Sequence, residues 1–104
     1  MKVGKLATPT RVARLVISKW YFYVLLCSDG SYYGGVTTDL DRRLNEHNAT
    51  SRGAKYTKAR RPVKLVYWAN YENRSKAQKA EYNFKKLKRK EKEELVETIN
   101  EEKI

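Results

Sequence analysis

The chain has 104 residues, the size of one domain, and its formal net charge at pH 7 is +11. Such an excess points to a polyanionic partner: nucleic acid, anionic lipid or an acidic protein. Hydrophobic residues make up 40% of the chain, too many for a disordered one. No apolar run approaches the roughly 18 residues that a membrane span needs. The single cysteine, Cys27, excludes an internal disulfide and a cysteine-based zinc cluster, and a free thiol fits a reducing, cytoplasmic compartment.

The N-terminal segment is basic and contains no acidic residue. Targeting peptides share this composition, but the segment lacks the apolar core of a signal peptide, and Pro9 interrupts its pattern. We therefore expect residues 1–19 to be a basic extension, either a flexible arm or the product of an early start site. The folded domain is predicted at residues 20–100, followed by a short tail at 101–104.

The domain is predicted to open with a β-hairpin. Aromatic and branched residues from Trp20 to Cys27 indicate a buried strand, and Ser31 to Val36 is its partner. A two-residue Asp29-Gly30 loop would place Tyr23 and Tyr33 on opposite faces of the hairpin. A three-residue loop that includes Ser28 would place both tyrosines on one face, and the sequence leaves this choice open.

Two adjacent glycines, Gly34 and Gly35, lie inside the second strand, where a residue without a side chain costs stability. In the three-residue register Gly35 lies opposite Tyr23 and leaves space above the sheet, where a ligand backbone can approach. A bulge or a strand end is an equally good explanation, so both remain open.

The later elements follow the hydrophobic periodicities. They are a helix at Asp39–Asn48, a basic loop at 49–61, a strand at Val63–Tyr71, a helix from Arg74 or Ser75 to Leu87, and a helix at Lys90–Ile99. The order β-β-α-β-α-α predicts an α+β fold with a small, three-stranded, mostly antiparallel sheet flanked by helices.

Arg43 and His47 share one face of the first helix with Leu40 and Leu44, so both lie at the edge of the core. A half-buried guanidinium needs a partner or an anion, and its planar fork suits phosphate. The alternatives are a structural salt bridge of Arg43, for example to Glu81, and a purely structural His47.

Glu81 lies beside the buried stripe of its predicted helix. A lone carboxylate can hold one hard divalent cation such as Mg2+, with waters and phosphate oxygens completing the shell. An ion pair with Lys85, one helical turn later, is the alternative, and the two are compatible.

These residues, taken together with their spacing, resemble the GIY-YIG nuclease superfamily. The resemblance rests on Tyr23-Val24-Leu25, Tyr33-Gly34-Gly35, Arg43, His47 and Glu81, and covers about residues 20–97. Within the superfamily, the segments 20–48, 53–68 and 80–96 look like its small one-domain bacterial branch, an uncharacterised protein family. The departures are an altered first motif, Gly34 in place of a branched residue, and Val36 where some relatives have lysine.

The resemblance implies a metal-dependent endonuclease that hydrolyses phosphodiester bonds in DNA, in preference to RNA, and selects its substrate by structure. One of Tyr23 and Tyr33 would activate water or relay its proton, with His47 near the nucleophile. Arg43 would bind the scissile phosphate, and Glu81 would be the single protein ligand of one Mg2+ or Mn2+.

The basic loop would then follow the phosphate backbone, unless it is only a solvated run of charge. Its expected contacts are Arg52, Lys55, Lys58, Arg60 and Arg61, with Tyr56 stacking on a base. Two other functions remain open: a nucleic-acid-binding module with little or no cleavage, and a basic protein bound to a ribosome or partner. Specificity would come from substrate shape, a protein partner or oligomerisation.

Overall fold

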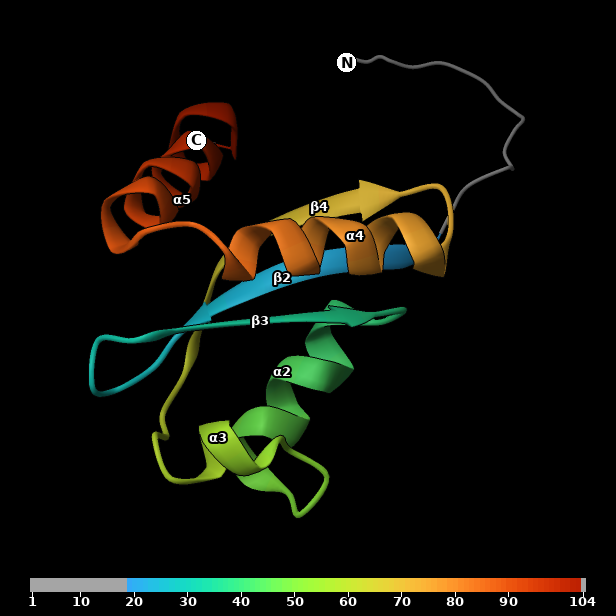
Figure 1. Cartoon of the computed structure of the whole chain (residues 1–104). Helices are drawn as coiled ribbons and strands as arrows, with labels where there is room; N and C mark the ends of the chain where they lie inside the picture. The colour runs from blue at the N-terminus through green and yellow to red at the C-terminus, as the bar shows by residue number, and fades with distance from the viewer. Residues whose placement is uncertain (1–18, 104) are drawn as a thin grey trace.

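The computed structural model describes residues 19–103. Its elements are β2 (Trp20–Leu26), β3 (Tyr32–Thr37), α2 (Leu40–Ala49), α3 (Lys55–Lys58), β4 (Lys64–Tyr71), α4 (Arg74–Lys85) and α5 (Arg89–Lys103). The strands form one antiparallel sheet in the order β3-β2-β4 (Figure 1). The predicted α+β fold is therefore confirmed. The predicted N-terminal extension lies, apart from Lys19, outside the described residues.

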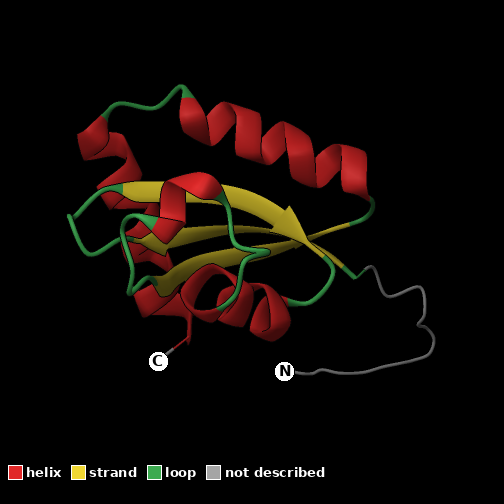
Figure 2. Ribbon diagram, turned by 90° about the horizontal axis from the view of Figure 1, so that it is seen from below, coloured by secondary structure: helices red, strands yellow, loops and turns green. Residues whose placement is uncertain are grey.

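Helices lie on both sides of the sheet: α2 and α3 lie below it and α4 lies in front of β2 in the view of Figure 1, and Figure 2 shows helices on either side of the strands. Because side chains alternate along a strand, β2 supplies both layers. Tyr23 and Leu25 pack with Leu40 and Leu44 of α2. The neighbouring residues Phe22 and Val24 pack instead with Phe84, Leu95 and Val96 of α4 and α5. The unbroken apolar run of β2 reflects this burial on both faces.

The hairpin adopts the three-residue loop. Leu25 pairs with Tyr33, and Tyr23 pairs with Gly35, so both tyrosines face α2. The Cys27 amide donates to the Ser31 carbonyl (2.8 Å), and the Gly30 amide donates to the Cys27 carbonyl (2.9 Å). Gly30 has a φ of +86°, the left-handed conformation that this turn requires and that glycine adopts without steric cost.

The segment at 49–61 differs from the predicted loop because it contains the short helix α3. Four residues are too few to show a hydrophobic period, and Ala54 at the N-cap makes no side-chain cap bond. The last helix is also longer than predicted and reaches Lys103. In the described part of the chain, no helix is both long and apolar enough to cross a membrane.

Replacing Gly30 with alanine tests the turn. A β-carbon at this position meets no heavy atom within 4 Å, so its only cost is the left-handed backbone. We expect Gly30→Ala to lower the free energy of unfolding by about 1–2 kcal/mol. Gly30→Asn should cost clearly less, because asparagine tolerates this region. Urea unfolding followed by tryptophan fluorescence measures both, and equal losses would contradict this explanation.

Candidate active site

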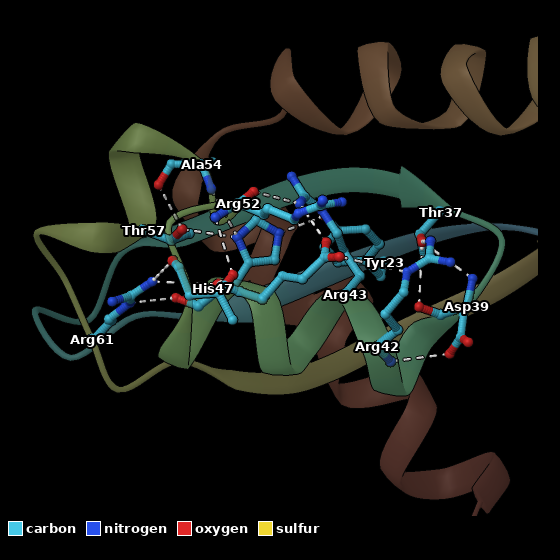
Figure 3. A network of polar contacts seen from close by, with 12 residues as sticks. Tyr23, Thr37, Asp39, Arg42, Arg43, His47, Arg52, Ala54, Thr57 and Arg61 are labelled. Atoms are coloured by element: carbon cyan, nitrogen blue, oxygen red, sulfur yellow. Dashed lines mark hydrogen bonds and ion pairs between the residues drawn. The ribbon is translucent and has the colours of Figure 1, made fainter.

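A chain of hydrogen bonds joins the sheet to α2 and α3. The Tyr23 hydroxyl lies 2.8 Å from Nε2 of His47, whose Nδ1 lies 2.8 Å from Oγ1 of Thr57 (Figure 3). The Thr57 hydroxyl in turn donates to the Ala54 carbonyl at 2.9 Å. His47 and Thr57 are fully buried and Tyr23 is 3% exposed, so these polar groups depend on one another.

The hydrogen bonds assign the tautomer of His47. Because Thr57 gives its proton to Ala54, its oxygen accepts from Nδ1–H, and Nε2 keeps a lone pair for the Tyr23 hydroxyl. The Ala54 amide also points at Nδ1, at 3.4 Å, which would favour the other tautomer, but that contact is longer than the two bonds at Thr57. In the tautomer that the two shorter bonds favour, Tyr23 is the donor and His47 the acceptor.

Burial keeps both groups neutral at pH 7. It is the largest cause that lowers the pKa of His47 to about 4, and the nearby Arg43 charge lowers it further. Burial also raises the pKa of Tyr23 to about 12, although Arg43 acts in the opposite direction.

Gly35 makes room for the Tyr23 phenol. A β-carbon at position 35 would lie 2.6 Å from Cζ of Tyr23 and closer still to its hydroxyl. The space above Gly35 is therefore filled by Tyr23 itself, and the β2–β3 pairing runs through this point without a bulge. Neither of the two explanations considered from the sequence describes this glycine.

Tyr33 lies between His47 and Tyr56. Its ring meets the imidazole edge-on with a centroid distance of 5.3 Å, and it stacks on Tyr56 at 5.9 Å. The Arg60 guanidinium lies over the Tyr56 ring at 3.8 Å from its centroid, and the Tyr56 hydroxyl donates to Ser31 at 2.7 Å. These contacts fix the ring of Tyr33 next to the buried pair.

Arg43 is held at the rim of the site. Its Nη1 donates to Oε1 of Glu46 and to the Arg52 carbonyl, both at 2.8 Å, while a quarter of the side chain, 25%, is exposed. The partner of Arg43 is thus Glu46 on its own helix, where the sequence suggested Glu81. A guanidinium fixed in this way, beside Tyr23, is suited to binding an anion that arrives from solvent.

Glu81 lies on α4, and its negative charge is the smallest of the causes that shift the pKa of Tyr23. Its side chain is 21% exposed and forms an ion pair with Lys85 at 3.0 Å, as the sequence suggested. Among the side chains that the structure describes, no three acidic, histidine or cysteine residues form a cluster that could hold a metal. Glu81, a partly exposed lone carboxylate, has the chemistry of a donor to one largely hydrated divalent ion.

The basic residues of the segment 49–61 serve different purposes. Arg61 binds carbonyls at the end of α2, with Nε 2.7 Å from the His47 oxygen, and Arg60 pairs with Asp29 at 2.9 Å. Arg52, Lys55 and Lys58 are exposed. Thr57 and Glu46 were not singled out from the sequence, because their roles depend on contacts that only the folded chain creates.

Comparison with known proteins assigns this chain to a family. A family model described as the GIY-YIG catalytic domain matches residues 19–94. A UPF0213 protein from Enterococcus faecalis is 56% identical over 82 residues, which are 77% of this chain and 92% of that protein. One from Listeria monocytogenes serotype 4b is 60% identical over 76 residues, 73% of this chain and 84% of its own length.

Two solved structures agree with the fold. A solution NMR structure of a protein from E. faecalis is 56% identical and covers 77% of this chain and 84% of its own, with a TM-score of 0.52. That of a UPF0213 protein from Bacillus halodurans is 46% identical and covers 76% and 83%, with a TM-score of 0.50.

The chain therefore belongs to the GIY-YIG catalytic-domain family, and such a domain implies nucleic-acid binding. Within that family it falls in the small single-domain bacterial group of UPF0213 proteins.

The buried state of His47 predicts a pH-dependent stability. The unfolded chain takes up a proton near pH 6.5, whereas folded His47 does so near pH 4. The unfolded state therefore binds more protons between these values, and stability falls as the pH is lowered through this range. We expect a loss of about 2 kcal/mol between pH 7.5 and pH 5.

Urea unfolding of tag-free protein at both pH values checks this expectation, because His47 is the only histidine in the chain. His47→Gln is the control: it should lower stability at pH 7.5 but remove most of the dependence on pH. An equally steep dependence in His47→Gln would assign the effect to other groups.

Proposed function

We propose that the protein is a divalent-metal-dependent endonuclease that hydrolyses phosphodiester bonds in DNA, selected by strand structure. The observation that carries this proposal is the Tyr23 hydroxyl, which donates to a buried, neutral His47 beside the rim guanidinium of Arg43. An acceptor for a proton, a group that transmits it and a cation for phosphate are thus present at one place.

In this proposal Tyr23 transmits the proton of the attacking water. As the hydroxyl of Tyr23 passes its own proton to Nε2 of His47, its oxygen accepts the proton that the water loses. This route avoids a free phenolate, which the raised pKa of Tyr23 disfavours. A bound phosphate also offsets the positive charge of Arg43, one of the causes that lower the pKa of His47, so substrate makes His47 a stronger base.

Arg43 would bind the scissile phosphate and stabilise the negative charge that develops on it. Glu81 would hold one Mg2+ or Mn2+, which supplies charge neutralisation at the phosphate when bound. The Glu81–Lys85 pair is partly exposed, and such pairs contribute little stability, so the carboxylate is available to a cation at small cost.

Exposed Arg52, Lys55 and Lys58 would contact neighbouring phosphates, whereas Arg60 and Arg61 would act mainly through the residues that they hold in place. Phosphate contacts carry little sequence information, so specificity would come from strand structure or a protein partner. We place the protein in the cytoplasm, because its buried cysteine is free.

Cleavage assays test the proposal. Branched, nicked, single-stranded and duplex DNA, and RNA, are incubated with the protein in Mg2+, in Mn2+ or in chelator. We expect metal-dependent cleavage of DNA that Arg43→Ala and Glu81→Gln each reduce about 100-fold or more. Glu93→Gln is the matched control, because Glu93 pairs with Arg89 on the surface of α5.

Metal-dependent cleavage that survives Glu81→Gln would refute the metal assignment. Tight binding without cleavage under every condition would identify the alternative, a nucleic-acid-binding module with this fold.

A further inference from the structure

A cavity of about 290 Å³ opens beside the proposed catalytic residues, between the N-terminal ends of α2 and α4 and the end of β3. Three arginines line it, Arg42 and Arg43 from α2 and Arg74 from α4. The hydroxyl-bearing residues Thr37 and Thr38 close one side. Figure 3 shows Arg42 beside Thr37, with Arg43 further along α2 toward His47.

The charges of this cavity do not balance. Its one carboxylate, Glu46, lies 2.8 Å from Arg43 and 3.7 Å from Arg42, so it is shared between them. Arg74 forms no ion pair with the described residues, and its guanidinium lies over the Trp20 ring at 5.4 Å from the centroid. Three guanidinium groups against one carboxylate leave the cavity with an excess of positive charge.

We propose that this cavity binds a second phosphate group of the nucleic acid, next to the phosphate held by Arg43, with Arg74 as its principal ligand. The inference rests on nucleic-acid binding in the proposed function, and not on cleavage. Arg43 lines the cavity and also borders Tyr23, so one strand can reach both places. Guanidinium forks bind phosphate oxygens in pairs, and the exposed Thr38 hydroxyl adds a neutral donor.

The position of Arg74 on α4 adds to this argument. It is the first residue of a 12-residue helix whose N-cap is Asn73, so the positive end of the helix dipole lies at its backbone and adds to the positive potential there. The Trp20 ring holds the guanidinium over the start of β2. An internal phosphodiester of the strand and a phosphate at a strand end share the chemistry that this cavity recognises.

The dependence of binding on salt tests the proposal directly. Affinity for a hydroxyl-ended DNA duplex is measured in chelator, where no cleavage occurs, over a series of salt concentrations. Each lost phosphate contact reduces the slope of log affinity against log salt by about 0.9. We expect Arg74→Gln to cause one such reduction and a loss of affinity at every salt concentration, while Arg74→Lys retains most of the slope.

Lys79→Gln is the matched control, because it removes one positive charge from the same helix but lines a different cavity. If Arg74→Gln gives the same slope as Lys79→Gln on every duplex, the proposal is overturned.

A duplex of the same sequence with terminal phosphates distinguishes an internal phosphodiester from a phosphate at a strand end. A slope reduction of equal size on both duplexes identifies an internal phosphodiester, whereas a reduction only on the phosphorylated duplex identifies a strand end. An Arg74-dependent slope in a protein that never cleaves would support this site and reject the nuclease. A protein that binds no nucleic acid at all would overturn both.

Discussion

The hydrogen bond between the Tyr23 hydroxyl and His47 forms only if several other parts of the structure are in place. It requires the three-residue hairpin loop, because that register places Gly35 opposite Tyr23 and leaves room for its phenol to reach His47. It requires Gly35, because any side chain there would occupy the place of the phenol. It also requires α3, because Thr57 satisfies the second nitrogen of a fully buried imidazole. A buried polar pair of this kind is stable only when every partner is in place.

The sequence predicted the elements better than it predicted these conditions. Apolar and aromatic runs predicted the strands and helical periodicities predicted the main helices, because both patterns arise from burial. The sequence does not decide the hairpin register, because Asp29-Gly30 suits both loops. It also does not show that Gly35 makes room for the Tyr23 phenol. Helix α3 left no period in four residues. What could not be predicted depends on contacts between segments far apart in the chain, such as Gly35 with Tyr23.

The positive charge of the chain is divided between two uses. Arg61 donates hydrogen bonds to carbonyls at the end of α2, and Arg60 forms an ion pair with Asp29 in the hairpin turn. Both arginines thereby maintain the geometry around His47. The sequence does not distinguish these two arginines from the exposed Lys55 and Lys58, because composition does not show which basic side chains bind partners within the protein. The net charge of +11 therefore does not by itself identify the basic side chains that are free to contact a polyanion.

Consecutive arginines of α2 illustrate how one helix can serve two neighbouring phosphates. Successive residues on a helix project about 100° apart, so Arg43 turns toward Tyr23 and Arg42 toward the end of β3. Glu46 lies one turn later and contacts both, which keeps them in place without a ligand and neutralises part of their charge. Arg74 from α4, on the other face of the sheet, gives the cavity an excess of positive charge. Because α2 and α4 pack on opposite faces of the sheet, the end of β3 is where their charges meet, and a strand of nucleic acid that follows this end would contact both layers at once.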